Sequence, residues 1–194
     1  MILIRAAEAA DAAQIAAIYA PFVENSGVSF EETAPDEAEI ARRIEAGSER
    51  FPWLVADERP NDGAGRDAPG TVLAFAYATA FRERPAYRFS VETSIYVLPD
   101  AQRRGIGTTL YGALLDTLEA QGFTQALGTI SLPNDASIRL HEMMGFFRAG
   151  TWRAIGWKKG HWRDVGLWQR PLADPPEPPP EPKSFREVGV VRHH

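Results

Sequence analysis

Residues 91–108 have the sequence VETSIYVLPDAQRRGIGT, which predicts a β-strand, a glycine-containing turn and the start of a helix. Because successive side chains of a strand point to opposite faces of the sheet, Glu92 and Tyr96 share one polar face. Gly105 and Gly107 carry no side chain, so backbone N–H groups at the helix N-terminus can approach a ligand closely. The helix dipole favours an anion there, and a pyrophosphate fits this site.

The glycine spacing excludes two common phosphate-binding motifs. A dinucleotide-binding turn needs a third glycine, where this chain has Leu110, and no Gly-Lys-Ser/Thr run of a P-loop is present. What remains is Gln/Arg-x-x-Gly-x-Gly, beginning at Gln102. Apolar residues then repeat at helical spacing until Gly122: Leu110, Tyr111, Leu114, Leu115 and Leu118. An ordinary strand, turn and helix with surface arginines fits the same residues, so the turn alone leaves both interpretations open.

A second helix is predicted after a strand over Gln125–Leu132. Residues 134–146 begin with Asn134 and Asp135, which are good N-terminal caps, and end near Gly145, which suits a C-terminal cap. The chain therefore contains two successive strand–helix units, and the pair is more specific than either unit alone.

Together the two units resemble the GNAT superfamily of acetyl-CoA-dependent N-acetyltransferases. That superfamily pairs a Gln/Arg-x-x-Gly-x-Gly/Ala pyrophosphate turn with a later Asn-x-x-Ala/Ser-x-x-Leu-Tyr-x-x-x-Gly-Phe helix. The second pattern matches Asn134–Phe146, except that His141 stands where tyrosine is frequent. The resemblance implies acetyl-CoA as cofactor and an α/β fold. Its mixed, mostly antiparallel sheet would be flanked by helices and splay between the strands of Glu92 and Gln125, with the cofactor in the split.

Short exact blocks narrow the resemblance to the phosphinothricin and methionine-sulfoximine N-acetyltransferases. The blocks lie in one order over about residues 2–170 and include Glu119–Phe123, and Phe51–Ala56 nearly matches a further block, Tyr-Pro-Trp-Leu-Val-Ala. The resemblance implies a small amino acid analogue as acceptor and a homodimer, for which the tryptophan-rich residues 151–169 offer aromatic surface. Glu31 is a departure, because phosphinothricin acetylases carry arginine there, so we expect an acidic substrate to be held differently.

The resemblance also assigns binding residues by their place in these motifs. The expected contacts of acetyl-CoA are Ile95, Tyr96, Val97, Arg103, Arg104, Gly105, Ile106, Gly107, Thr108 and Asn134. The expected contacts of the substrate are Phe30, Arg82, Arg84, Tyr87, Glu92, Thr93 and Ser94. Asn134 can also simply cap its helix. Arg82 and Arg84 are either solvated surface residues or an anion clamp, since guanidinium groups offer forked donors to a carboxylate or phosphinate.

Glu92 and His141 are the candidate catalytic residues. An amine must be neutral to attack a thioester, so a carboxylate near the nucleophile can take its proton. Glu92 lies shortly before the glycine turn, near the reactive end of a cofactor bound there; the alternative is a solvent-facing acid in a salt bridge. His141 lies on the partly apolar face of its helix. It is either a core residue or a proton donor to the departing thiolate.

The composition favours one globular domain and argues against several other functions. The chain has 194 residues, 44% of them hydrophobic, and a formal net charge of −5 without a concentrated basic face, so nucleic acid is not an expected partner. Cysteine is absent, which excludes disulfides and a cysteine acyl-enzyme, and we expect no metal site. Since no signal peptide or membrane-spanning apolar run is found, we expect a cytoplasmic protein without a membrane partner.

Strands and helices alternate along residues 1–170, the predicted acetyltransferase domain. The other predicted strands are Ile2–Arg5, Phe51–Asp57, Thr71–Phe81, Phe146–Ile155 and His161–Gln169, and the other helices begin at Asp11 and run near Asp36–Ala46. Glu58–Gly70 predicts a mobile loop. In residues 171–194, seven prolines from Pro171 to Pro182 predict a disordered or extended tail.

Three functions fit these residues. The first is direct transfer of an acetyl group to the α-amine of a small amino acid analogue. The second is acetylation of a protein N-terminus or another xenobiotic amine. The third is a non-catalytic acetyl-CoA-binding module. Glu92 beside an intact glycine turn argues against the third function, because a sensor needs no base.

Overall fold

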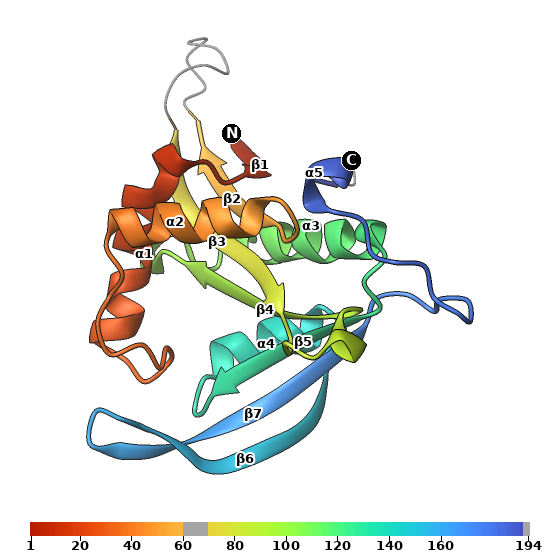
Figure 1. Cartoon of the computed structure of the whole chain (residues 1–194). Coiled ribbons are helices and arrows are strands. Elements are labelled where there is room, and N and C mark those ends of the chain that lie inside the picture. The colour runs from red at the N-terminus through yellow and green to blue at the C-terminus, as the bar shows by residue number, and fades with distance from the viewer. Residues whose placement is uncertain (60–69, 192–194) are drawn as a thin grey trace.

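The computed structural model describes residues 1–59 and 70–191, which fold around one seven-stranded sheet (Figure 1). The strand order is β1-β2-β3-β4-β5-β7-β6, and every neighbouring pair is antiparallel except β4 and β5. The strands are β1 (Ile2–Ala6), β2 (Trp53–Glu58), β3 (Thr71–Ala80), β4 (Ser90–Val97), β5 (Gln125–Ser131), β6 (Phe147–Lys158) and β7 (His161–Pro171). The predicted fold class is confirmed.

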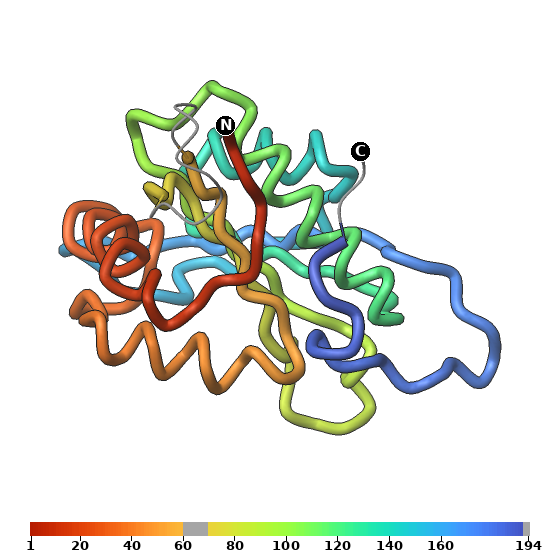
Figure 2. Tube along the Cα trace, turned by 90° about the horizontal axis from the view of Figure 1, so that it is seen from above, coloured from red at the N-terminus to blue at the C-terminus, as the bar shows by residue number. Residues whose placement is uncertain are grey.

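Helices cover both faces of the sheet. One face carries α1 (Ala12–Glu24) and α2 (Glu37–Ser48), and the other carries α3 (Ile106–Gln121) and α4 (Asp135–Met143) (Figure 2). A short helix, α5 (Phe185–Val188), lies beside α3 near the C-terminus. Three 3-10 turns complete the elements: η1 (Ala9–Asp11), η2 (Pro85–Tyr87) and η3 (Pro99–Ala101).

The helices of each face form a separate apolar core with the sheet. Leu110, Leu114 and Leu118 of α3 are fully buried in one core, which explains their helical spacing in the sequence. Val91 of β4 belongs to the same core, whereas Tyr96 of β4 packs into the core of α1 and α2. The alternation predicted for β4 is therefore confirmed, and the even-numbered side chains of this strand project toward the α1–α2 face.

The sheet opens between β4 and β5. Their parallel ladder has only three register pairs and ends where Glu92 lies beside Leu127. Beyond that point β4 continues to Val97 and β5 to Ser131, with no register pair between them. The backbone of β4 after Glu92 therefore has one edge without a neighbouring strand, which is the split that the GNAT resemblance implies.

The β6–β7 hairpin is longer than the sequence predicts. Gly156 indicates a break in the pattern, yet β6 continues through it to Lys158. The hairpin then turns at two residues with positive φ, Lys159 at +51° and Gly160 at +74°, as a tight two-residue turn requires. A Cβ at Gly156 would lie 2.2 Å from the ring of Phe30, so the missing side chain makes room for that ring instead of ending the strand.

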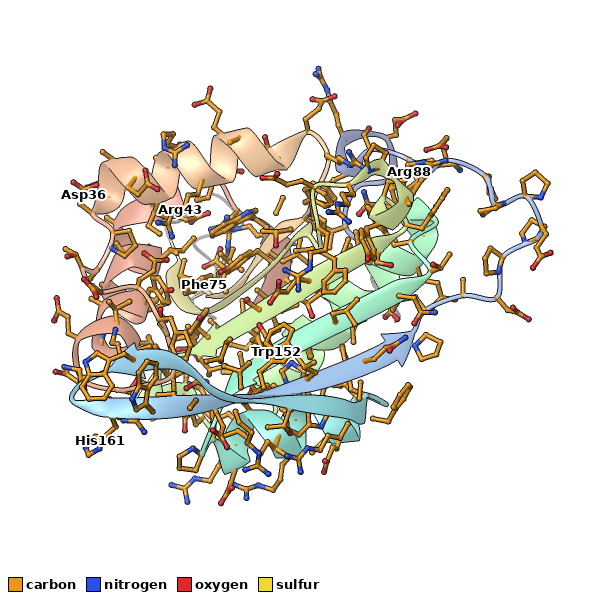
Figure 3. The ribbon with its side chains drawn as sticks, turned by 60° about the horizontal axis from the view of Figure 1, so that its bottom comes forward. Asp36, Arg43, Phe75, Arg88, Trp152 and His161 are labelled. Atoms are coloured by element: carbon orange, nitrogen blue, oxygen red, sulfur yellow. The ribbon has the colours of Figure 1, made fainter. Side chains whose placement is uncertain are left out.

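The segment after Pro171 runs outward over its prolines and then returns to α3 (Figure 1). The backbone N–H of Lys183 donates to the carbonyl of Gln121 at 2.7 Å, and Phe185 is buried in the α3 core. Glu181 accepts hydrogen bonds from Arg88, which lies near this segment in Figure 3. The proline content predicts the extended stretch. The return of the chain to α3 depends on burial of Phe185 in the apolar core of the folded protein, which the proline content does not predict.

Two further features concern the chain as a whole. The loop predicted over Glu58–Gly70 lies largely outside the described residues, which resume at Gly70. Within the described ranges, none of the helices combines the length and apolar character needed to cross a membrane.

Candidate active site

The N-terminus of α3 is open to a ligand. Gly105 precedes the helix with a φ of +76°, and a Cβ built on it would meet no atom within 4 Å. Arg103 also has a positive φ, of +62°. Left-handed residues in such a turn direct neighbouring N–H groups to one side, which favours anions, and the first N–H groups of a helix lack intrahelical partners. The predicted pyrophosphate turn therefore has a backbone geometry suited to phosphate oxygens.

The rest of the turn connects it to the split in the sheet. A Cβ at Gly107 would lie 3.5 Å from Val97 and 3.7 Å from Leu140, so the turn sits against the open end of β4. The guanidinium of Arg104 donates to the carboxylate of Glu58 at 2.5 Å, which ties this side chain to β2. The turn thus lies next to the free edge of β4.

The other predicted cofactor contacts contribute mainly through their backbone. Ile95 and Val97 lie on the free edge of β4, and the ring of Tyr96 packs 4.7 Å from that of Tyr19. Ile106 is buried in the α3 core, and the hydroxyl of Thr108 lies 3.9 Å from the sulfur of Met143.

Asn134 caps α4, because its side-chain oxygen accepts a hydrogen bond from the N–H of Ser137 at 3.2 Å. Capping leaves the amide nitrogen of Asn134 available, so the predicted contact with the cofactor is compatible with the cap.

Glu92 lies at the end of the β4–β5 ladder, on the α1–α2 face. The hydroxyl of Thr129 in β5 donates a hydrogen bond to Oε1 of Glu92. Thr129 is exposed, and it follows Leu127 on the same face of β5, so the bond links the strands where they separate. Glu92 has no ion pair among the described residues. A solvent-accessible carboxylate held in this way can accept a proton from a bound amine.

Two pockets flank Glu92 on this face, and Thr129 lines both. The apolar pocket has a volume of about 290 Å³ and is lined by Phe81, Tyr87, Ser90, Gln125, Leu127, Gly128, Thr129, Ala149, Trp152, Leu167, Trp168 and Gln169. The polar pocket has a volume of about 350 Å³ and is lined by Tyr19, Val28, Ser29, Phe30, Glu31, Ser94, Tyr96, Thr129 and Ser131.

The apolar pocket has aromatic walls and a cation beside it. Phe81 and Tyr87 contact each other edge to face at 5.7 Å, and Trp152 of β6, labelled in Figure 3, lines the same pocket. The guanidinium of Arg82 lies 4.9 Å from the ring of Phe81 and 5.9 Å from that of Trp152. Arg84 is exposed at the start of η2 and lines neither pocket. Arg82 is also exposed and lines neither pocket, but its guanidinium contacts two of the pocket rings, whereas no such ring contact is found for Arg84 among the described residues.

The polar pocket has an acidic wall. The carboxylate of Glu31 accepts hydrogen bonds from Arg43 at 2.7 Å and from the hydroxyl of Tyr19 at 3.1 Å. Lys158 of the β6–β7 hairpin donates to the backbone carbonyl of Glu31. Phe30 lines the same pocket with its ring against Gly156. The β6–β7 hairpin and the loop between α1 and α2 therefore contact each other at the polar pocket, which Ser94 also lines.

His141 lies in a buried hydrogen-bond network on the opposite, α3–α4 face. Its Nδ1 lies 2.8 Å from the carbonyl of Ser137, which can only accept, so Nδ1 carries the proton. Its Nε2 then accepts from the hydroxyl of Tyr111 at 3.0 Å. Burial lowers the pKa of His141, and the hydrogen bond to Ser137 opposes that shift only in part. The imidazole is therefore neutral near pH 7.

Thr93 belongs to the same network. Its hydroxyl lies 2.8 Å from that of Tyr111 and 3.1 Å from the carbonyl of Leu127, and because the proton of Tyr111 is directed to His141, the single proton of Thr93 is shared between these two acceptors. The side chain of Thr93 thus points away from the two pockets, although the sequence groups it with the substrate contacts. Only its backbone reaches the acceptor side of the sheet.

Thr129 and Trp152 are the site residues that the sequence analysis missed. Thr129 shares a face of β5 with Leu127 and Ser131 by simple alternation, which is a usable signal. Nothing in the sequence indicates which residue of β4 it meets, because that register joins two distant segments. Trp152 belongs to residues 151–169, which the sequence analysis offers as aromatic surface for a dimer, and in the structure it lines the apolar pocket together with Leu127.

Comparisons with known proteins show the family and the fold. The profile of the acetyltransferase (GNAT) family matches residues 18–146. A phosphinothricin N-acetyltransferase of Streptomyces viridochromogenes is 42% identical over 177 residues, which cover 91% of either chain. An L-methionine sulfoximine/L-methionine sulfone acetyltransferase of Pseudomonas paraeruginosa is 35% identical over 167 residues, 86% of this chain and 92% of the relative.

A solved structure gives the same result for the fold. The phosphinothricin acetyltransferase of Sinorhizobium meliloti, in complex with acetyl-CoA, matches with a TM-score of 0.81 and 38% sequence identity. The match covers 92% of this chain and 95% of that one.

Proposed function

The chain belongs to the acetyltransferase (GNAT) family and is an acetyl-CoA-dependent N-acetyltransferase, and from this premise we propose that it acetylates the α-amine of a small amino acid analogue. The acceptors are of the phosphinothricin or methionine-sulfoximine type, because relatives that span nearly the whole chain are named for these compounds. The observation that carries the proposal is Glu92, held by Thr129 between two pockets at the point where the sheet opens.

The residues of the split fit acetyl-CoA. Gly105 leaves open space beside the N–H groups of the turn, where a pyrophosphate would bind. The free edge of β4 at Ile95 and Val97 offers backbone groups to the amides of the pantetheine arm, as an added strand would use them. When bound, acetyl-CoA supplies an activated acetyl thioester. The protein has to orient the amine and remove its proton.

Glu92 acts as the general base in this proposal. The amine donates to the carboxylate directly or through one water, and Glu92 takes the proton as the nitrogen attacks the acetyl carbon. The new bond joins the nitrogen to the acetyl carbon, the carbon–sulfur bond breaks, and the thiolate leaves. Thr129 holds the carboxylate in place during this transfer, since its hydroxyl donates to Oε1.

The role of proton donor to the thiolate, suggested for His141, stays a prediction. Both of its ring nitrogens already have hydrogen-bond partners, Ser137 and Tyr111. We propose that His141 acts chiefly as a positioning residue, because it holds the tyrosine hydroxyl that in turn contacts Thr93 at the start of the split.

Arg82 is the proposed anchor for the acid group of the acceptor. It lies over two rings beside the apolar pocket, so its guanidinium is presented to the acceptor face with part of its solvation removed. Holding the carboxylate there would leave the α-amine close to Glu92. Arg84, at the edge of the same loop, would contribute a weaker and more solvent-screened attraction.

We also propose that the enzyme is a homodimer. Trp157 and Trp162 at the hairpin tip are 58% and 64% exposed, and Ile155 beside them is 57% exposed. Aromatic side chains of this kind are enriched at interface cores, and a second copy would cover them.

The test of the proposed activity is release of CoA thiol with each of the two analogues. Glu92→Gln should keep acetyl-CoA affinity and lower turnover by roughly 10²- to 10⁴-fold, the usual effect of removing a positioned base. Raising the pH should restore part of the loss, because more of the amine is then neutral. Thiol release with peptides or polyamines but with neither analogue would contradict the substrate class. Near-normal turnover of a folded Glu92→Gln enzyme would contradict the base.

A further inference from the structure

The β6–β7 hairpin contacts the acceptor face at two separate places along β6. Trp152 lines the apolar pocket. Further along the strand, the ring of Phe30, which lines the polar pocket, lies against Gly156, and Lys158 donates to the backbone carbonyl of Glu31. The spacing of these contacts along β6 therefore decides whether the hairpin supports both pockets at the same time.

A β-bulge lies between the two contacts. The register partner of Trp152 is Val165 of β7. The next register pair joins Gly156 to Arg163. Residues 153–155 of β6 therefore have a single residue of β7 opposite them. A bulge bends its strand and redirects the side chains next to it, and bulges are frequent beside active sites.

Asp164 is the residue opposite the bulge, and its side chain binds to it. Oδ1 of Asp164 accepts a hydrogen bond from the backbone N–H of Ala154 at 2.8 Å, and Oδ2 accepts from the guanidinium of Arg153 at 2.9 Å. The backbone carbonyl of Asp164 accepts from the N–H of Leu132 at 2.9 Å. The N–H of Ala154 lowers the pKa of Asp164, so the carboxylate is charged at neutral pH. Asp164 thus ties the bulge to the residue that follows β5.

The backbone of Ala154 requires such support. Its φ is +47°, in the left-handed region, which is unfavourable for a residue that carries a Cβ. The side chain of Arg153 is 82% exposed, so its ion pair with Asp164 is screened by solvent and contributes little. The bond from the N–H of Ala154 to the carboxylate is therefore the main contribution of Asp164 to the shape of the bulge.

We propose that Asp164 is a positioning residue for acceptor binding. Its carboxylate fixes the bulge, and the bulge sets the spacing between Trp152 at the apolar pocket and the contacts of Gly156 and Lys158 at the polar pocket. The inference rests on the proposed function and adds to it a residue that lines neither pocket. Without the carboxylate the bulge relaxes, and the two pockets lose their common support. Glu92 and the cofactor turn belong to other elements and keep their places.

The test is the split between KM and kcat for methionine sulfoximine in Asp164→Ala. A hydrogen bond to a charged group contributes a factor of about ten or more, so KM should rise by about tenfold. Lost binding that is equal in the ground and transition states raises KM alone, so kcat and acetyl-CoA affinity should stay within about twofold of the wild type. The matched control is Asp174→Ala, at an exposed aspartate outside the hairpin, which should keep the wild-type KM. A fall in kcat with an unchanged KM would overturn the proposal.

A second substitution at the bulge provides a rescue. Glycine adopts a positive φ without the penalty of a Cβ, so Ala154→Gly combined with Asp164→Ala should recover most of the lost acceptor affinity. Ala154→Gly alone should bind the acceptor as the wild type does. If the charge of Asp164 acted in some other way, KM of the double variant would stay as high as that of Asp164→Ala, and this result would overturn the proposal.

Hydrogen exchange separates failure of this inference from failure of the proposed function. If the wild type releases thiol with neither analogue, the proposed function is wrong, and the bulge is then followed by mass spectrometry of the peptide over residues 155–163. Exchange in this peptide should be faster in Asp164→Ala than in the wild type, unchanged in α3, and slow again in the double variant. Equal exchange in Asp164→Ala and the wild type would overturn the role of Asp164 in the bulge.

Discussion

Replacing Thr129 by valine tests the link between β5 and the base. Valine has nearly the shape of threonine and lacks only the hydroxyl that donates to Glu92. A hydrogen bond to a charged group contributes about 1.5–3 kcal/mol, and 1.36 kcal/mol corresponds to a factor of ten in rate. If the bond serves only to hold the carboxylate for proton transfer, kcat/KM for methionine sulfoximine should fall by about 10- to 150-fold.

The assay is CoA thiol release, combined with acetyl-CoA affinity and thermal unfolding. Thr129 is exposed, so the valine variant should unfold within a few degrees of the wild type. Thr129→Ser keeps the hydroxyl and should retain most of the activity. Thr71→Val, at an exposed threonine of β3 outside both pockets, should leave kcat/KM unchanged. Full activity in Thr129→Val, or equal losses in the valine and serine variants, would refute the reasoning.

Three other changes test separate parts of the site and assembly. Gly105→Val should weaken acetyl-CoA binding, because the new side chain would enter the open space of the turn at a positive φ, and unchanged affinity in a folded variant would contradict that placement. His141→Phe should lower stability at pH 8 by about 1–2 kcal/mol through the lost bond to Tyr111. Because burial lowers the folded-state pKa of His141, the wild type should lose stability as pH falls below about 6.5. The difference in free energy of unfolding between the wild type and His141→Phe should therefore be smaller at pH 5.5 than at pH 8. An equal difference at the two pH values would argue against a buried neutral imidazole. Replacing Trp157 and Trp162 together by serine should convert a dimer into a monomer by sedimentation at micromolar concentration, and a monomeric wild type would rule out the assembly.

The sequence was most informative where local physics decides the outcome. The spacing of Leu110, Leu114 and Leu118 predicts α3 because a helix buries one stripe, and the structure buries all three. Alternation along β4 likewise predicts the face of Glu92, and the glycines predict an open helix N-terminus.

The parts that depend on contacts between distant segments could not be predicted in the same way. Thr129 reaches Glu92 only because the β4–β5 ladder ends at Leu127, and no local pattern specifies that register. Gly156 is a residue type typical of turns, yet it lies inside β6, where its missing side chain leaves room for the ring of Phe30. Proline content likewise carries no information on where Phe185 is anchored.

The short ladder between β4 and β5 affects the stability of the folded enzyme as well as its reaction. Only three register pairs join β4 to β5 in the described residues, and in the proposed function acetyl-CoA occupies the rest of that seam. A ligand that binds only the folded state stabilises it by about 2.7 kcal/mol at a hundredfold excess over its dissociation constant. The lifetime of the folded enzyme is thereby coupled to the supply of the acetyl donor that it consumes.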